Sequence, residues 1–361
     1  MGHVSGANRP TQSSPYRVPG WVKLAVSFLV SAILLWLAAT QVDFPSLLDA
    51  LRHANYLYVV LAIGVYFVDL AIRAARWQVL LTTVGPISWR RLYPVLVVGY
   101  MANNLLPGKV GELSRAYLVG QREKVSGTAV LATVAIERVV DGLTVIVLLF
   151  VTLLLLPSTL PQIGGLTMIA TVAAIAFGLG IVAFVVLLAG RRTWVRLASH
   201  LLERLPSHIG DRLALLLDRF ISGLDVLRDP RQVSRTVGLS VLVWVVGATT
   251  YILIAAAFGI PLSLVGAIAT ICVVNLATAL PQAPGGLGVF DIAAQQMFRL
   301  FITLVVAPDP GRVAAVASGI TIVLHAVIFV PVVVVGLWCL WRMNLPLLAP
   351  RSALGRNVSS N

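Results

Sequence analysis

Two short stretches decide the fold: Pro107-Gly108-Lys109-Val110-Gly111-Glu112 and Pro284-Gly285-Gly286-Leu287-Gly288-Val289. Both fit the pattern P-G-x-[VL]-G, and each interrupts an apolar run in its own half of the chain. Membrane hydrocarbon holds no water to satisfy a broken backbone, so such breaks persist only inside protein or beside a cavity. Broken helices at matching positions of two halves are typical of binding sites in transporters.

The composition around these breaks is that of an integral membrane protein. The 361 residues are 58% hydrophobic and only 11% charged, whereas a soluble chain is about 45–50% apolar and about 25% charged. The net charge of +13 would suggest nucleic acid as the partner of a soluble protein. Here the basic residues gather in loops, as the positive-inside rule requires, so we expect no nucleic-acid partner.

The apolar runs predict an all-α, polytopic fold. A spanning helix needs about 20 mainly apolar residues. Continuous candidates cover residues 21–40, 57–82, 127–156, 164–189, 235–258 and 312–341. Two further regions, 92–122 and 262–306, contain the breaks. They predict either re-entrant helices or pairs of short spans, in addition to about six full spans.

The Lys and Arg residues predict the orientation. Most of them lie in the N-terminal tail, in residues 73–124, in the loop at 190–234 and near the C-terminus. Placing these regions in the cytoplasm satisfies the positive-inside rule. We therefore expect a multi-pass cell-membrane protein in which both tails, 1–20 and 343–361, are cytoplasmic. The transmembrane domain between them covers residues 21–342.

This orientation makes the two halves an inverted repeat. Repeat one, about 57–156, is a span, a broken segment and a span, and repeat two, about 235–341, has the same order. The first break then enters from the cytoplasm and the second from outside. Two amphipathic stretches, 44–51 and 213–227, are expected to lie along the membrane surfaces as structural elements.

Ionisable residues inside the apolar segments are the next signal, because each costs about 2.5–3.5 kcal/mol at the bilayer centre. The acids are Asp69, Glu112, Glu137, Asp141 and Asp291. Helical spacing predicts that Asp69 pairs with Arg73, and Arg138 with Asp141. The alternative to a functional role is structural ion pairing near helix ends. Glu137, Arg138 and Asp141 favour function, since three charges within five residues need a polar interior.

The first break carries more charge than the second. Lys109 and Arg115 add positive charge to its Gly-rich backbone, which could cradle a phosphate, while Glu112 suits the first turn of a restarting helix. Asn103 and Asn104 precede this break, and Asn275 and Gln282 flank the second. An anionic headgroup would therefore be held mainly by the first half.

Other chemistries find little support. Cys272 and Cys339 lie in apolar runs and the five histidines have no metal spacing, so we expect no metal site and no cofactor. His325 is expected to be hydrogen-bonded within the helix bundle. The chain contains no Walker A, G-x-S-x-G or H-E-x-x-H motif, so we expect neither an ATPase nor another enzyme in this chain. An acid/base reaction at Glu137 and Asp141 remains the alternative.

Four blocks of this sequence resemble the lysylphosphatidylglycerol synthase transmembrane region, a family also called flippase-like domain proteins. They read RAARWQVLL at 73–81, NNLLPGKVGELSR at 103–115, ERVVD at 137–141 and LPQAPGGLGVF at 280–290. The resemblance spans about residues 20–342 and implies a lipid flippase-like membrane protein. It does not imply lysyl transfer, because the synthases carry a large soluble catalytic domain.

The expected function is movement of a phospholipid or lipid-linked headgroup between leaflets, with anionic or phosphate-bearing membrane lipids as partners. Two alternatives are a membrane anchor for a separate glycosyltransferase or lipid synthase, and an ion-coupled small-solute transporter. The residues expected to contact the lipid are Arg73, Arg76, Asn103, Asn104, Pro107, Gly108, Lys109, Gly111, Glu112, Arg115, Glu137, Arg138, Asp141, Asn275, Pro281, Pro284, Gly285, Gly286 and Gly288.

Overall fold

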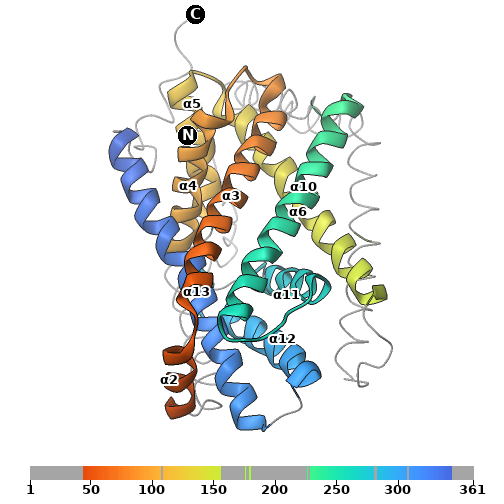
Figure 1. Ribbon diagram of the computed structural model, residues 1–361. Helices are drawn as coiled ribbons and strands as arrows, with labels where there is room; N and C mark the ends of the chain where they lie inside the picture. Colours follow the sequence, from red (N-terminus) through yellow and green to blue (C-terminus); the bar gives the residue numbers. More distant parts are fainter. Residues whose placement is uncertain are drawn as a thin grey trace, which may run out of the picture.

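The computed structural model describes residues 44–106, 109–155, 228–279, 283–306 and 309–343, together with positions 175, 179 and 226. Within these residues the chain is helical (Figure 1). The helices are α2 (Phe44–His53), α3 (Tyr56–Leu80), α4 (Trp89–Leu105), α5 (Val110–Glu123), α6 (Gly127–Leu155), α10 (Pro230–Ala257), α11 (Leu264–Ala277), α12 (Val289–Val306) and α13 (Pro310–Met343), with 3-10 turns η1 (Leu81–Thr83) and η3 (Pro284–Gly286).

The predicted polytopic all-α fold is confirmed. Four predicted spans become α3, α6, α10 and α13, each long and apolar enough to cross a membrane, and η3 with α12 forms a fifth such segment. Both predicted breaks interrupt their helices, between α4 and α5 and between α11 and α12. The amphipathic stretch at 44–51 is helical, as α2. The candidate spans 21–40 and 164–189 and the stretch 213–227 lie outside the described residues.

The first spans of the two repeats, α3 and α10, pack against each other in opposite directions along their length. The Asn55 N–H, at the start of α3, donates to the Ala257 carbonyl at the end of α10, at 2.8 Å. Near the other end, Arg76 Nη1 donates to Ser240 Oγ at 2.8 Å. Local signals set both helix starts: the Asn55 side chain caps α3, and Asp229 caps α10 ahead of Pro230.

Each broken segment is a re-entrant hairpin. Short connections join α3 to α4 and α5 to α6, so α4 enters and α5 leaves at the same end of the molecule. The second repeat does the same at the opposite end with α11 and α12 (Figure 1). The 17-residue α4 is about 25 Å long at 1.5 Å per residue, so it reaches far into a hydrocarbon core of about 30 Å.

Helix packing gives the repeat its inverted symmetry. The entering helix α4 packs against α13, and its counterpart α11 packs against α6, so each hairpin lies against the last span of the other repeat. Two apolar cores follow from this exchange. One surrounds α4 and α5 and takes Val332 and Cys339 from α13. The other surrounds α11 and α12 and takes Val145 and Leu149 from α6.

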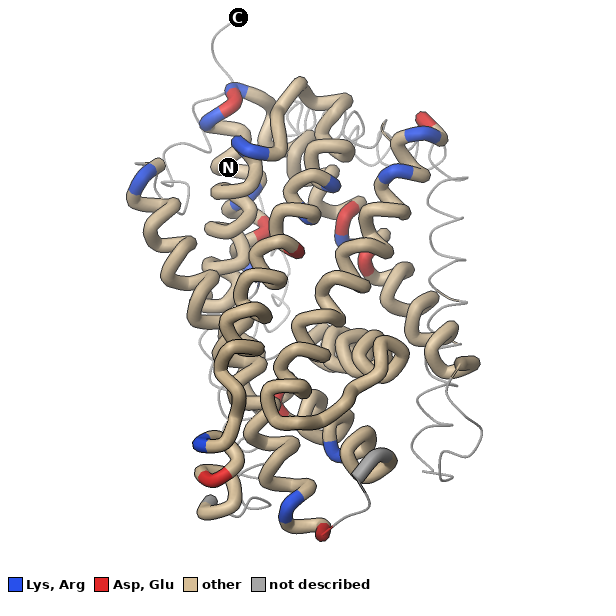
Figure 2. Tube along the Cα trace, viewed as in Figure 1, with Lys and Arg blue, Asp and Glu red and all other residues tan. Residues whose placement is uncertain are grey.

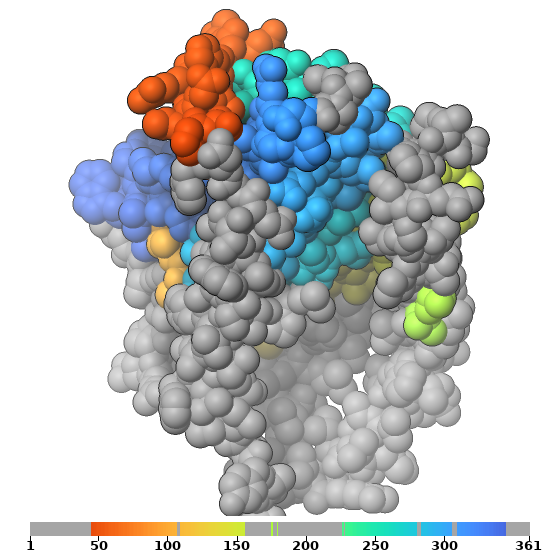
Figure 3. Space-filling model, turned by 90° about the horizontal axis from the view of Figure 1, so that it is seen from below, coloured from red at the N-terminus to blue at the C-terminus, as the bar shows by residue number. Residues whose placement is uncertain are grey.

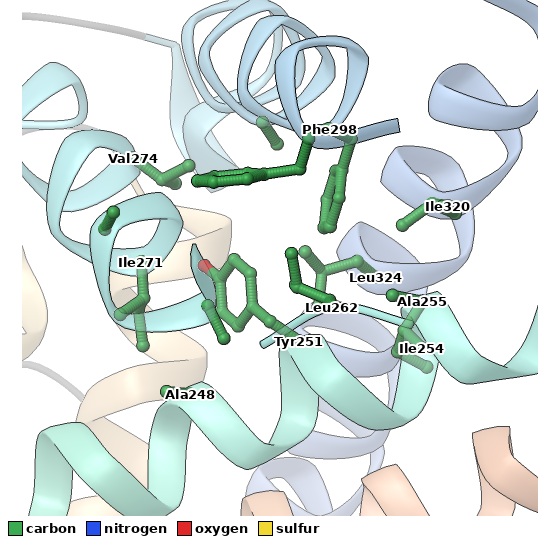
Figure 4. Packing of buried hydrophobic residues seen from close by; sticks show 14 of the residues in the cluster. Ala248, Tyr251, Ile254, Ala255, Leu262, Ile271, Val274, Phe298, Ile320 and Leu324 are labelled. Atoms are coloured by element: carbon green, nitrogen blue, oxygen red, sulfur yellow. The ribbon is translucent and has the colours of Figure 1, made fainter. Parts of the chain in front are cut away.

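The second core is rich in aromatic rings and small residues (Figure 4). Tyr251 of α10 and Phe298 of α12 stack with ring centroids 6.3 Å apart. Below this core, α2 packs against α13, and Figure 3 shows both on the face seen from below, beside α12. Large apolar side chains such as Leu57, Leu154 and Trp341 are exposed on the outer surface, as expected where lipid takes the place of water.

Candidate functional site

A group of mostly buried charges lies between α3, α5 and α6, within the helix bundle (Figure 2). Four acids and four arginines contribute, so their formal charges balance. The members are Asp69, Arg73, Arg76, Glu112, Arg115, Glu137, Arg138 and Asp141. A charge removed from water must be paired and hydrogen-bonded. We call these eight residues the charge cluster.

Glu137 of α6 is the centre of the charge cluster, with none of its surface exposed. Arg115 of α5 binds both of its oxygens, at 3.2 Å and 2.7 Å. Arg138 Nη2 donates to Oε1 at 2.6 Å, and Arg76 Nη2 lies 3.4 Å from the same oxygen. Glu137 thus accepts charge-assisted hydrogen bonds, the strongest class in proteins, from Arg115 of α5 and Arg138 of α6, and forms an ion pair with Arg76 of α3.

Arg76 ties α3 to two other helices. It is fully buried, forms a bidentate pair with Asp141 of α6 and donates to Ser240 of α10. A turn earlier on α3, Arg73 Nε donates to Asp69 at 2.7 Å, as the four-residue spacing predicts. The Arg73 guanidinium also lies over the Trp244 ring of α10, at 5.6 Å from its centroid. The contacts with Ser240 and Trp244 join α3 to α10 inside the helix bundle.

Arg138 differs from the other arginines of the charge cluster. Its side chain is 39% exposed, whereas that of Arg73 is 11% exposed and those of Arg76 and Arg115 are 0% and 2%. It lies 3.6 Å from Glu112 and 3.3 Å from Asp141. The contact with Glu112 brings Arg138 to the first turn of α5. Arg138 is therefore the arginine of the charge cluster best placed to meet a ligand.

Close packing of glycines holds the first break. A β-carbon on Gly111 would lie 1.9 Å from the Gly99 carbonyl oxygen and 2.6 Å from Asn103 Oδ1. The Gly111 N–H donates to that Asn103 oxygen at 2.8 Å. A β-carbon on Gly99 would meet the Arg115 stem at 2.4 Å. Only glycine at both positions lets α4 and α5 approach closely enough to bury Arg115.

The Arg115 guanidinium is further fixed by stacking on the Trp77 ring, at 4.0 Å from its centroid. Trp77 Nε1 donates to Thr133 of α6 at 3.1 Å. Arg115 therefore lies buried between Glu137 and Trp77 and stabilises the charge cluster. The exposed basic residue of this break is Lys109, which has a left-handed backbone (φ 53°) and precedes the first residue of α5.

The second break turns through three glycines with positive φ, Gly285 (74°), Gly286 (78°) and Gly288 (83°). The carboxylate of Asp291 accepts a hydrogen bond from the Gly288 N–H at 2.9 Å. Its other oxygen contacts His325 Nδ1 at 2.8 Å, and His325 Nε2 faces the Gly285 carbonyl at 3.0 Å. The expectation that His325 is hydrogen-bonded is confirmed.

The two breaks meet inside the molecule. A β-carbon on Gly285 would lie 3.4 Å from the main-chain oxygen of Asn104, and η3 packs against α4. On the matching helix end, Asn275 is exposed and donates to the Ile271 carbonyl of its own helix. Pro284 is half-buried in η3. The predicted site residues Pro107, Gly108 and Pro281 lie outside the described residues.

Sequence reasoning missed several residues that complete the site. The Tyr100 hydroxyl oxygen accepts a hydrogen bond from Arg73 at 3.2 Å, Ser240 accepts one from Arg76, and Trp77 stacks on Arg115. Ser240 is 164 positions from its partner in the sequence, so no local pattern could reveal it. Trp77 lies one position after Arg76 in the RAARW block, and this adjacency was its only signal. Among the described residues, no group of three or more His, Cys, Asp or Glu could hold a metal ion.

The fold and the site define a multi-pass membrane protein whose two inverted repeats each carry a re-entrant hairpin. The chain belongs to the lysylphosphatidylglycerol synthase TM region family, whose model matches residues 21–336. It is 27% identical to a protein named glycosyltransferase AglD from Haloferax volcanii, over 92% of this chain and 56% of that protein. The chain thus spans little more than half the length of this relative.

Two further relatives are named membrane proteins. A UPF0104 membrane protein from Methanothermobacter thermautotrophicus is 29% identical over 67% of this chain and 75% of its own length. A second UPF0104 membrane protein from the same organism is 23% identical over 76% of this chain and 80% of its length.

Proposed function

We propose that this protein moves a phospholipid or a lipid-linked headgroup between the two leaflets, without ATPase activity in this chain. One observation carries the proposal: two re-entrant hairpins from opposite ends meet at Gly285 and Asn104, beside the charge cluster. Backbone breaks and charges at membrane depth are expensive, and they mark substrate pathways in transporters. A headgroup that passes between the hairpins would find polar partners from both ends of the molecule.

The residues of the first break divide into a frame and a contact surface. Arg76 and Arg115 are buried and both pair with the buried Glu137, so these three residues form the frame. Lys109 is exposed and Arg138 partly exposed, and both lie near the first turn of α5. The positive end of the α5 dipole and these two cations attract an anionic headgroup. Asn103, Asn104 and Glu112 complete this surface.

The orientation we propose follows from the basic residues. Basic residues gather at the end of the molecule where α5 lies (Figure 2). They belong to the starts of α4 and α10 and to the ends of α5 and α13, and include Arg90, Arg91, Arg122, Lys124, Arg231, Arg235 and Arg342. Only Arg52, Arg299 and Arg312 among the described basic residues belong to the opposite end, on α2, α12 and the start of α13. By the positive-inside rule the α5 end is cytoplasmic. The α4–α5 hairpin then enters from the cytoplasm, and both tails are cytoplasmic.

Lipid movement by the purified protein tests the proposal. The protein is reconstituted in liposomes that carry fluorescent phosphatidylglycerol, and dithionite reports transfer between leaflets. We expect faster transfer than in empty vesicles, and a loss of at least about tenfold in Arg138→Gln, because a charge-assisted contact contributes about 1.5–3 kcal/mol. Arg91→Gln is the control, since Arg91 is exposed and pairs with Glu123 away from the breaks. Transfer no faster than in empty vesicles would contradict the proposal.

A second candidate is a membrane partner for a separate glycosyltransferase or lipid synthase. The relative named glycosyltransferase, of which this chain matches 56%, favours it. This role predicts that Arg138→Gln and Lys109→Gln leave function intact in cells, while liposomes show no lipid transfer. A soluble-solute transporter would instead show uptake of a small solute with no transfer of labelled lipid.

A further inference from the structure

Asp291 and His325 form a closed hydrogen-bonded ring around the second break. His325 Nδ1 lies 2.8 Å from Asp291 Oδ1, and His325 Nε2 lies 3.0 Å from the Gly285 carbonyl oxygen. The second Asp291 oxygen accepts from the Gly288 N–H at 2.9 Å. The ring thus ties α13, the glycine turn and the first turn of α12 together. The proposed headgroup contacts of the first break make no use of it.

The two contacts of His325 need one proton more than a neutral imidazole and a carboxylate carry together. While Asp291 is a carboxylate, it and the Gly285 carbonyl oxygen can only accept hydrogen bonds, so each ring nitrogen must supply a hydrogen. Only the imidazolium form of His325 donates to both oxygens. A neutral ring would leave a nitrogen lone pair facing one of them. The Asp291 carboxylate balances the positive charge of the imidazolium, as a charge at this depth requires.

The first repeat shows what is special about this pair. There, Arg115 on the second hairpin helix pairs with Glu137 on the following span. In the second repeat the acid is on the hairpin helix α12, and the cation is His325 on the following span α13. Arginine keeps its proton throughout the physiological range, whereas histidine changes its charge near neutral pH. One break is therefore held by a permanent ion pair and the other by a titratable one.

The surroundings leave Asp291 as the charged partner of His325. Phe290 and Phe329 flank the imidazole of His325, with ring centroids 4.6 Å and 6.2 Å from its centroid. Helix α4 contributes the Asn104 carbonyl oxygen beside Gly285. The side chains of His325 and Asp291 are 13% and 15% exposed, so the pair is not sealed. Five of the described helices contact α13, and their other ionisable residues follow by helix. They are Asp49, Arg52 and His53 on α2, Tyr56, Tyr58, Tyr66, Asp69, Arg73 and Arg76 on α3, Arg90, Arg91, Tyr93 and Tyr100 on α4, Arg231, Arg235 and Tyr251 on α10, and Arg299 on α12.

Most of these groups already have partners elsewhere. Asp69 pairs with Arg73, and Arg76 pairs with Asp141, within the charge cluster. His53 pairs with Asp49 on the exposed helix α2. The Asp291–His325 pair is therefore a separate polar centre of the second repeat, beside the glycine turn.

We infer that the Asp291–His325 pair is a proton-binding site that opens and closes the second break, and that the proton is the coupling ion of the lipid movement proposed above. In the closed form the imidazolium holds Gly285 and Asp291. Release transfers the Nε2 proton to water, breaks the hydrogen bond to the Gly285 carbonyl and leaves His325 neutral. The net charge of the pair then changes from zero to minus one, and the glycine turn is free to leave Asn104.

The first experiment follows the break itself and needs no lipid transfer. Leu287, the exposed residue of this turn, is changed to Cys, and labelling by a water-soluble maleimide is followed from about pH 5 to about pH 8, where histidine titrates. Leu113→Cys, exposed on α5 in the first break, is the matched control for thiol ionisation. After division by this control, we expect labelling at position 287 to rise several-fold as the pH rises.

Two variants assign that rise to the pair. His325→Gln is expected to label at the high rate at every pH. Asp291→Asn has the same expected result and replaces His325→Gln in the test if that variant fails to fold. His53→Gln, which removes the exposed histidine of α2, is expected to behave as the wild type. Nitrogen NMR of the labelled imidazoles provides a second readout, in which His325 carries two N–H groups at the acidic end and one at the basic end. A corrected labelling rate that is flat with pH, or an unchanged rise in both variants, overturns the proton site.

Transport then separates this inference from the proposed function. With one proton coupled to each lipid, a gradient of about one pH unit would sustain about a tenfold leaflet asymmetry, lost in His325→Gln. Lipid transfer that ignores the gradient overturns the coupling and leaves the proposed function standing. A titrating break in a protein that transfers no lipid preserves the proton site and removes the lipid function.

Discussion

Gly285 of the second break lies against the main-chain oxygen of Asn104 at the end of α4. A β-carbon added to Gly285 would lie 3.4 Å from that oxygen. The two residues come from opposite repeats and from hairpins that enter at opposite ends. The last carbonyls of a helix lack partners within that helix, so α4 needs protein around its end inside the membrane. The contact gives each re-entrant hairpin support from the other.

The glycine contact between α4 and α5 predicts a large steric effect. Gly111→Ala would place a methyl group 1.9 Å from the Gly99 oxygen, and overpacking typically costs about 1–3 kcal/mol. We expect a clear drop in the melting temperature of the detergent-solubilised protein. Gly64→Ala in α3, where no atom lies within 4 Å of the new carbon, should be neutral or slightly stabilising. Equal melting temperatures for both variants would show that the close approach is absent.

The centre of the charge cluster predicts a large electrostatic effect. Glu137→Gln removes the partner of Arg115 and leaves buried positive charge uncompensated, which costs about 3–5 kcal/mol. Glu123→Gln is matched in chemistry, since Glu123 pairs with Arg91 at 3.2 Å, but Arg91 is exposed, so the expected cost is about 0–1 kcal/mol. Thermal or denaturant unfolding of both variants measures the difference, and similar losses would argue against a buried network.

The exposed Lys109 predicts a preference for anionic headgroups, and Lys124 provides the matched control. Lys109 and Lys124 both have left-handed backbones, with φ of 53° and 55°, and lie at opposite ends of α5. Lys109→Gln should slow the transfer of phosphatidylglycerol by about fivefold, since a lysine near anionic headgroups contributes about 1 kcal/mol. Phosphatidylcholine transfer should change little, and Lys124→Gln should change neither. An equal effect of both variants would place the headgroup elsewhere.

The cysteines predict a simple accessibility pattern. Cys272 and Cys339 are free and buried, so a bulky water-soluble maleimide should leave both unlabelled in the folded protein. Denaturation in detergent should make both reactive, because the thiolate needs solvent access to react. Counting labels by mass spectrometry before and after denaturation checks this expectation. Fast labelling of the native protein would show that one of the two cores opens readily.

Much of the fold followed from local sequence. Apolar length fixed α3, α6, α10 and α13, and the Pro/Gly motifs fixed where the intervening segments break, because both are properties of neighbouring residues. The same holds for pairs at helical spacing: Asp69 with Arg73 and Arg138 with Asp141 were predicted, and both pairs form. The match between the two motifs also predicted an inverted repeat, and in the structure α4 packs on α13 as α11 packs on α6.

Tertiary structure decided which charges meet and which remain open. Nothing in the sequence pairs Arg115 with Glu137, Arg76 with Ser240 or Asp291 with His325, since these partners lie on different helices. From the sequence, Lys109 and Arg115 are both expected to contact a headgroup. In the structure, packing against Gly99 and Trp77 encloses Arg115, whereas Lys109 is exposed. The length of an apolar run and the position of a backbone break depend on neighbouring residues in the sequence. The burial and pairing of charged side chains depend on helices that meet only after the chain has folded.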